Sequence, residues 1–270
     1  MISLIVAVAE FFVVVAFALA AVLLNTIDAR GFLASAIVGF AIVYGGGFQW
    51  FMMVAVFFTL GVIFTLYKYG YKRRIGAAQR KGGARNWPHI LANGGLASII
   101  ALANLFGPSI SFAALFLGAV STSAADTAAT ELGLLYHSRP RLITSPSRSV
   151  SPGTSGGVSP LGFVGAALAS AVIGLLGIPL GILPNPYLLV PIAIAGGLAG
   201  AVADSLMGAT MQRKGYCIIC GKPTEALTHC GERTKPTGGF PYVENNVVNV
   251  LSTVVGALVS LSLLLFLTAS

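Results

Sequence analysis

Long apolar runs separated by short polar segments dominate the chain. A transmembrane helix needs about 20 mostly apolar residues, and fewer suffice where one end meets protein instead of lipid. Eight runs approach this length, at residues 2–25, 31–46, 48–67, 90–106, 110–136, 160–183, 187–211 and 246–268. Because the second and fourth runs are short, a count of seven spans stays open. The pattern predicts an all-α fold, a polytopic transmembrane helical bundle of about eight helices.

Composition excludes a soluble globular domain. The chain is 56% hydrophobic and only 9% charged, with a mean hydropathy of +0.88, whereas soluble domains have charges on about a quarter of their residues. We therefore expect residues 1–270 to form one integral-membrane domain, with cytoplasmic loops at 68–89, 137–159 and 212–244.

The basic residues segregate along the predicted spans. If all eight runs cross the membrane, the sixteen Lys and Arg residues fall on one side, and the turns on the opposite side are short and uncharged. Cytoplasmic loops carry an excess of Lys and Arg, so we predict that this side is cytoplasmic and that both termini are outside. The net charge of +8 either only sets the topology or also binds anionic headgroups or polyphosphate.

Three carboxylates lie deep in the predicted spans. Asp126 and Asp204 each follow the outer start of a span by sixteen residues, which places them at matching depth, about 24 Å along the helix axis. Glu131 follows Asp126 by five residues, about 140° around a helix, so either the helix unwinds there or the two carboxylates reach one ion from different sides. Carboxylates at this depth usually bind a metal, a counter-charge or protons. We predict that all three are catalytic and bind Mg²⁺; the alternative is that the aspartates pair with buried arginines.

A glycine-rich segment after the fifth run is a candidate for phosphate binding. The segment SRPRLITSPSRSVSPGTSGGVSPLG combines arginines and hydroxyls with PGTSGG directly before the sixth run. Glycine lets backbone N–H groups approach an anion, and the N-terminus of the following helix favours negative charge. The segment is not a Walker A motif. The predicted phosphate-binding residues are Arg139, Arg141, Gly153, Thr154, Ser155, Gly156 and Gly157.

Polar residues also open two other spans. The segment KGGARNWPHILANGG brings Lys81, Arg85, Asn86 and Asn93 toward the same side. The last span opens with VENNVVNVLST, in which Asn245, Asn246 and Asn249 form a polar stripe at helical spacing. Helix capping accounts for one of these asparagines. We predict that the set orients a phosphate or metal-bound water.

All three cysteines lie in one predicted loop, which reads CIICGKPTEALTHCG. Clustered thiols in a reducing compartment indicate a metal instead of a disulfide, and C-x₂-C-G is typical of a zinc knuckle. Cys217, Cys220, His229 and Cys230 supply four ligands, although adjacent side chains rarely converge on one ion. A structural Zn²⁺ that holds the loop together and unliganded thiols are the two interpretations.

Six segments in a fixed order resemble the integral-membrane family that contains plant phytyl-phosphate kinase and animal transmembrane protein 19. The segments are GGARNWPHILANG, ADTAATELG, PRLIT, PGTSGGVS, ADSLMGATMQ and ENNVVNVLS, and the similarity runs from about residue 31 to residue 265. The central family motif usually reads Asp-Thr-aromatic-Ala-Ser-Glu. Here Ala128 and Thr130 replace the aromatic residue and the serine, while both acidic positions are present.

The resemblance implies a membrane-embedded prenyl-phosphate kinase. Such an enzyme transfers the terminal phosphate of a nucleoside triphosphate, CTP in the plant member, to a prenyl monophosphate with Mg²⁺, at the cytoplasmic face of the bilayer. The matched motifs add Thr144 and Gln212 to the phosphate-binding residues. We expect a lipid substrate, a nucleotide and the bilayer as partners, and no nucleic acid. An ion-coupled transporter and a CTP-dependent lipid cytidylyltransferase are the alternatives.

Overall fold

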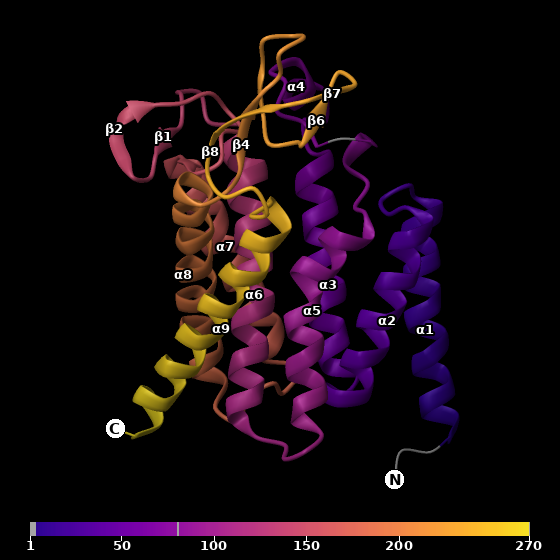
Figure 1. The fold of residues 1–270 in the computed structure, drawn as a ribbon. Coiled ribbons are helices and arrows are strands. Elements are labelled where there is room, and N and C mark those ends of the chain that lie inside the picture. Colours follow the sequence, from indigo (N-terminus) through magenta and orange to yellow (C-terminus); the bar gives the residue numbers. More distant parts are fainter. Residues whose placement is uncertain (1–3, 80, 270) are drawn as a thin grey trace.

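The computed structural model describes residues 4–79 and 81–269. Within them, eight long α-helices pack side by side as one bundle (Figure 1). They are α1 (Leu4–Leu23), α2 (Ala29–Gly46), α3 (Phe48–Leu66), α5 (Trp87–Asn104), α6 (Ile110–Gly133), α7 (Pro160–Gly177), α8 (Leu189–Thr210) and α9 (Asn245–Ala269). Seven of these described helices are long and apolar enough to cross a membrane, and the eighth, α5, is not apolar enough over its length to count among them. The predicted all-α polytopic bundle is confirmed.

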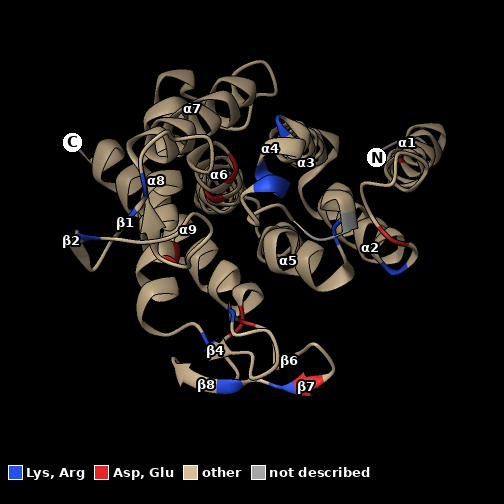
Figure 2. Cartoon of the chain, turned by 90° about the horizontal axis from the view of Figure 1, so that it is seen from above, with Lys and Arg blue, Asp and Glu red and all other residues tan. Residues whose placement is uncertain are grey.

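The connections alternate between the two ends of the bundle. One end carries the short turns at residues 105–109 and 178–188, including the 3₁₀ turn η2 (Pro186–Leu188), and both chain termini lie there (Figure 1). The other end, here called the loop end, carries the short helix α4 (Tyr69–Arg74), the 3₁₀ turn η1 (Lys81–Gly83) and all the strands. Seen from above, basic segments gather on α4 and on the strands of the loop end (Figure 2).

Local sequence sets where these helices begin and end. Asp28 caps α2 by accepting a hydrogen bond from the Gly31 N–H at 2.7 Å, and Ser159 caps α7 in the same way through Gly162. The sixth predicted span, 160–183, is too long: α7 ends at Gly177, and Pro179 cannot extend the helix because it has no backbone N–H to donate to the preceding turn.

Small residues let α6, α8 and α9 approach closely at the centre of the bundle. A Cβ added to Gly118 of α6 would lie 2.5 Å from the Gly256 carbonyl oxygen of α9. The Ser260 hydroxyl of α9 donates to the Ile192 carbonyl of α8 at 3.0 Å. Close backbone approach through glycine and interhelical hydrogen bonds is how helices associate in lipid. This packing places the loop-end segments of the three helices next to one another.

Short antiparallel strands order the loops of the loop end, which the sequence did not indicate. After α6, strands β1 (Arg141–Leu142), β2 (Ser145–Ser149) and β3 (Gly157–Val158) form a sheet in the order β2-β1-β3. After α8, strands β4 (Lys214–Tyr216), β5 (Pro223–Thr224) and β8 (Lys235–Gly238) form a second sheet in the order β5-β4-β8, and β6 (Thr228–His229) pairs with β7 (Glu232–Arg233). We refer to residues 212–244 as the insert.

Candidate functional site

Asp126 and Asp204 meet between α6 and α8. Their carboxyl groups lie within hydrogen-bonding distance of each other. Asp126 lies seven residues before the end of α6 and Asp204 six before the end of α8, so both are about 10 Å below the loop end. Both side chains are half-buried. Two like charges in contact repel, so this pair needs a shared proton or a bound cation.

Asn249 of α9 connects this aspartate pair to α5. With its amide nitrogen facing the carboxylate, Asn249 donates to Asp204 Oδ2 at 3.2 Å and accepts from Asn93 Nδ2 at 3.1 Å. The Ser252 hydroxyl, one turn along α9, donates to the Asn249 carbonyl at 2.9 Å and lies close to Asp204. Asn93 and Asn249 are both buried. Four helices therefore contribute polar groups at one depth, and Ser252 is a member that the sequence analysis missed.

The polar groups continue along α5 to a buried arginine. Asn93 Nδ2 donates to the His89 carbonyl at 2.9 Å, and Arg85 lies just before the Asn86 cap at which α5 begins. Arg85 is buried and donates to the Phe58 carbonyl of α3 at 3.3 Å. Its guanidinium also lies over the Phe58 ring, 5.0 Å from the centroid. The predicted residues Arg85 and Asn93 thus lie on one polar path that leads to the aspartates.

Glu131 faces away from the aspartate pair. Lys72 Nζ of α4 lies 2.6 Å from Glu131 Oε2, and both side chains are at most 2% exposed. The Thr65 hydroxyl donates to Glu131 Oε1 at 3.2 Å. Both carboxylate oxygens therefore have protein partners, and the offset from Asp126, about 140° around the helix, explains why Glu131 faces different neighbours. The structure brings together only two of the three predicted Mg²⁺ ligands and places the third in a buried ion pair.

The glycine-rich loop lies against the end of α8. A Cβ added to Gly156 would lie 2.7 Å from the Ala209 backbone, so only glycine fits at this position, where φ is also +79°. The Ser155 hydroxyl donates to Glu225 of the insert, and Gln212 Nε2 donates to the other Glu225 oxygen at 2.7 Å. Glu225 also lies within electrostatic range of Asp204. The loop and the insert meet next to the aspartate pair.

Arg213 is buried beside Glu225, and some of its hydrogen-bond donors are unpaired. Its Nη2 donates to the Glu225 carbonyl and lies 3.9 Å from Glu244 Oε1. Its Nε and Nη1 are buried without a hydrogen-bond partner in the part of the chain that the structure describes. Buried unpaired guanidinium donors are costly, and they indicate a site for an anion. Sequence reasoning had counted Arg213 only among the basic loop residues.

The remaining predicted phosphate-binding residues lie outside this cluster. Arg139 and Thr144 are exposed, and Arg141 is exposed with its Nη1 donating to the Pro146 carbonyl of its own hairpin at 2.7 Å. Asn86 caps α5, the exposed Asn245 accepts a hydrogen bond from the Asn249 amide at its backbone carbonyl at 3.0 Å, and Asn246 is half-buried. Gly153, Thr154 and Gly157 belong to the same loop as Ser155. The side chain of Lys81 lies outside what the structure describes.

An apolar groove runs between α1, α2, α3 and α5 and ends at the polar path. Its walls include Phe17, Val38 and Phe58, and its polar edge consists of Arg85 and His89 together with Asn93. The groove has a volume of about 60 Å³, several times the space that a single buried water needs. This groove places a short apolar wall next to the buried guanidinium of Arg85.

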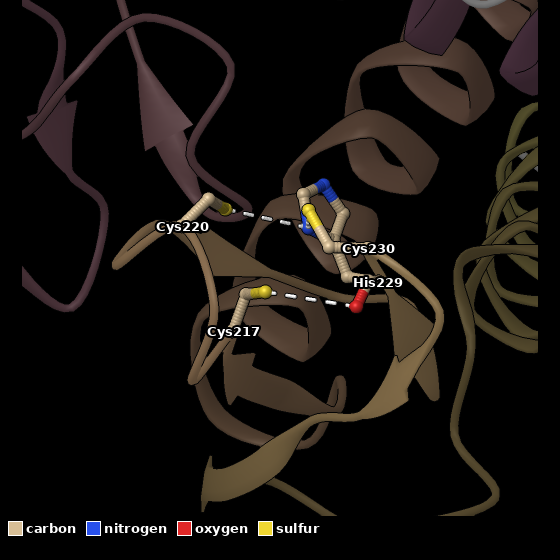
Figure 3. Close-up of side chains that lie close together, drawn as sticks. All are labelled: Cys217, Cys220, His229 and Cys230. Atoms are coloured by element: carbon tan, nitrogen blue, oxygen red, sulfur yellow. Dashed lines mark hydrogen bonds between the residues drawn. The ribbon is translucent and has the colours of Figure 1, made fainter.

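The cysteine cluster lies in the insert (Figure 3). The four ligand atoms of Cys217, Cys220, His229 and Cys230 all lie within 4.8 Å of one another. A hydrogen bond from the Cys220 backbone N–H lowers the pKa of the Cys217 thiol to about 6, whereas hydrogen bonding to Cys220 raises the pKa of Cys230 to about 11. The four side chains lie close enough together to bind one ion.

The fold and the site define a multi-pass integral membrane protein with a polar centre buried near one membrane face. The chain belongs to the integral membrane protein DUF92 family, whose model matches residues 12–257. This membership agrees with the resemblance drawn from the six segments.

Plant and archaeal proteins are among the relatives of the chain. Protein PGR of Arabidopsis thaliana is 31% identical over 250 residues, which cover 82% of this chain and 84% of the relative. An uncharacterized membrane protein of Methanocaldococcus jannaschii is 32% identical over 70% of this chain and 76% of its own length. Protein VTE6, chloroplastic, of Arabidopsis thaliana is 26% identical over 88% of this chain and 66% of the relative. No solved structure matches the chain.

Proposed function

We propose that this protein is a prenyl-phosphate kinase, which transfers the terminal phosphate of a nucleoside triphosphate, with CTP as the expected donor, to a prenyl monophosphate. The observation that carries the proposal is the pair of half-buried aspartates at the loop end. The resemblance to the family that contains plant phytyl-phosphate kinase supplies the reaction class. By the positive-inside rule, the loop end faces the cytoplasm, where nucleotides are present.

The aspartate pair fits a divalent cation. Two carboxylates in contact need a positive partner, and Mg²⁺ prefers carboxylate oxygens together with substrate phosphates. Asp126 and Asp204 would hold Mg²⁺, which supplies charge neutralisation for the nucleotide phosphates. Asn249 orients Asp204 through its hydrogen bond to Oδ2, and Ser252 in turn bonds the Asn249 carbonyl. Glu131 is not included because Lys72 and Thr65 already occupy its oxygens.

The donor phosphates are proposed to lie under the insert. Arg213 offers two unpaired donors there, and Ser155 and Gln212 present a hydroxyl and an amide N–H that now reach Glu225. These are the donors that a polyphosphate requires. Nucleotide phosphates and the Glu225 carboxylate compete for the same groups, so we expect Glu225 to move when the donor binds.

The acceptor lipid is proposed to lie in the groove between α1, α2, α3 and α5. The groove, with a volume of about 60 Å³, would hold only the part of the chain next to the phosphate, and the rest of the tail would extend into lipid. Arg85 would bind the monophosphate at the polar edge, and Asn93 connects that edge to Asn249 and Asp204. Acceptor and donor would thus approach the aspartate pair from opposite sides.

The transfer itself needs little from the protein beyond position and charge. An oxygen of the acceptor monophosphate, already ionised near pH 7, forms the new bond to the γ-phosphorus. The bond between that phosphorus and the β,γ-bridging oxygen breaks, and the nucleoside diphosphate leaves with the electron pair. No general base is required, because the attacking oxygen carries no proton. Arg213 and Arg85 stabilise the charge on the leaving and attacking groups.

Product analysis tests the proposal directly. Purified full-length protein is incubated with Mg-CTP and phytyl or geranylgeranyl monophosphate, and the products are identified by mass spectrometry. We expect prenyl diphosphate and CDP in equal amounts, and no turnover after chelation of Mg²⁺. Release of pyrophosphate would indicate a cytidylyltransferase. Absence of turnover with any triphosphate, in folded protein, would overturn the kinase assignment, and ion-driven uptake into liposomes would then identify a transporter.

Arg213→Gln tests the donor site. Hydrogen bonds to charged groups contribute about 1.5–3 kcal/mol, so we expect the KM for the nucleotide to rise by about 10–100-fold while the KM for the lipid changes little. Arg213→Lys keeps the charge and should restore part of the affinity. The matched control is Arg233→Gln, because Arg233 is exposed on β7 of the same insert. A nucleotide KM that is equal in both glutamine variants would remove Arg213 from the donor site.

A further inference from the structure

The insert has the architecture of a metal-binding module built from two tight hairpin turns. The first turn lies between β4 and β5 and carries Cys217 and Cys220, and the Cys217 N–H closes it by donating to the Lys222 carbonyl at 2.9 Å. The second turn joins β6 to β7 and carries His229 and Cys230. Each hairpin thus presents two ligand side chains, and both pairs face one point (Figure 3).

We infer that Cys217, Cys220, His229 and Cys230 bind one structural Zn²⁺, and that this zinc-bound insert holds Glu225 over the glycine-rich loop beside the aspartate pair. The first half of this inference does not depend on the proposed kinase activity.

The distances match a tetrahedral ion. Cys220 Sγ lies 3.5 Å and Cys230 Sγ 3.3 Å from the same ring nitrogen, His229 Nδ1. Ligands at Zn–S and Zn–N distances of about 2.3 and 2.0 Å on a tetrahedron are separated by about 3.5 Å. The cysteines are free thiols in the structure. Three thiolates and one imidazole form a soft, closed ligand set that suits zinc and leaves no position for a substrate.

The backbone explains how two adjacent residues reach the same ion. Cys230 has a left-handed φ of +52°, and Gly231 follows with a φ of +85°. This turn directs the Cys230 side chain to the side on which His229 Nδ1 lies. The objection that neighbouring side chains diverge holds for extended strands and helices, and it does not apply at a left-handed position. Left-handed geometry in a cysteine is costly, and metal ligation would compensate for it.

The zinc site lies next to the segment that carries Glu225. Residues 225–227 connect β5 of the first hairpin to β6 of the second, and the Thr234 hydroxyl fixes this connection by donating to the Ala226 carbonyl at 2.7 Å. From there Glu225 accepts from Ser155 and Gln212. One ion joins both hairpins, so its loss should make residues 225–227 more mobile. The position of Glu225 against the glycine-rich loop would then no longer be fixed.

Metal content tests whether the insert binds zinc. Full-length protein purified in detergent without added zinc should contain about one zinc per chain by elemental analysis, and His229→Asn and the Cys220→Ser/Cys230→Ser double variant should contain less than about a tenth of that. His137→Asn is the matched control, because His137 is exposed outside the insert and its loss should leave the zinc in place. Should the ligand variants fail to fold, maleimide labelling of the wild type decides: we expect protected thiols that react only after chelation. Wild type without zinc, with reactive thiols or with a disulfide, overturns the site.

Hydrogen exchange tests whether the zinc-bound insert holds Glu225 over the glycine-rich loop. Chelation should increase exchange in residues 212–238 and also in the glycine-rich loop, residues 151–158. Glu225→Gln should keep the zinc and increase exchange by about tenfold in the loop, because a neutral amide binds Ser155 and Gln212 more weakly than a carboxylate. Glu232→Gln, an exposed change on β7, is the control. Loop exchange that stays unchanged after chelation would overturn the link between zinc and Glu225.

Discussion

Asparagine in place of Asp126 or Asp204 should lower the rate of phosphoryl transfer by about 10³-fold or more while the protein remains folded. Positioning and charge neutralisation supply nearly all of the catalysis in this reaction, and groups that neutralise the transferred phosphate are worth about 10³–10⁵ in rate. An amide keeps the size and the hydrogen bonds of the carboxyl group but removes the negative charge that retains a divalent cation. Each variant is measured by single-turnover formation of prenyl diphosphate at saturating Mg-CTP.

Asp28→Asn is the matched control for both variants. Asp28 is the remaining aspartate of the chain, and it caps α2 through the Gly31 N–H. Asparagine caps a helix as well as aspartate does, so activity and stability should stay within about twofold. If Asp126→Asn and Asp204→Asn are as active as Asp28→Asn, the aspartate pair is not the catalytic centre.

The same variants separate stability from chemistry. Two carboxylates in contact repel, and replacing one by an amide that donates to the other should leave the thermal unfolding temperature unchanged or raise it. Loss of activity with retained or increased stability identifies residues held in an unfavourable arrangement for function. A loss of activity that merely followed unfolding would instead indicate a structural pair.

Much of the fold could be predicted because the spans and their topology depend only on the order of residues along the sequence. Hydrophobic runs of about 20 residues define the spans, and the position of Lys and Arg defines which loops share a side. The errors came from local signals, such as Pro179, which ends α7 early. The strands of the loop end could not be predicted, because their residues Arg141 and Ser145–Ser149 do not alternate between apolar and polar positions.

The site could be predicted only where depth alone brings residues together. Asp126, Asp204 and Asn249 meet because each lies at a similar distance from the loop end of its helix. Which other side chains meet depends on the direction in which each one points from its helix. Sequence spacing gives relative directions only for residues of the same helix. The spacing of Asp126 and Glu131 did signal that the two face different neighbours. It could not show that α4 folds back to pair Lys72 with Glu131.

The roles of Glu225 and Arg213 in the site could not be predicted, for a different reason. Both belong to the insert, where position depends on tertiary contacts of irregular backbone and not on a helical period. Only the structure shows their roles: the Glu225 carboxylate accepts from Ser155 and Gln212, and the Arg213 guanidinium has two nitrogens without hydrogen-bond partners among the described residues. The insert therefore contributes to the proposed donor site, and it is more than a connection between α8 and α9.

Breaking the ion pair between Lys72 and Glu131 should have the largest effect on stability. Lys72→Met leaves Glu131 with a buried, unpaired charge, and Glu131→Gln does the same to Lys72. Removing one partner of a buried pair costs about 3–5 kcal/mol. The double variant Lys72→Met/Glu131→Leu removes both charges, and Thr65 keeps a partner in the Gly61 carbonyl at 2.8 Å, so we expect it to recover most of the loss. Unfolding by denaturant in detergent micelles measures all three against Arg73→Met, an exposed change on α4.

Activity of the double variant then decides the role of Glu131. As a partner of Lys72, Glu131 holds α4 against α6 and contributes nothing to the chemistry, so the folded double variant should retain transfer within about tenfold of wild type. As a third Mg²⁺ ligand, Glu131 would be indispensable, and the double variant would be folded but as inactive as Asp126→Asn. The geometry favours the first outcome, because a lysine ammonium 2.6 Å from the carboxylate occupies the position that a cation would need.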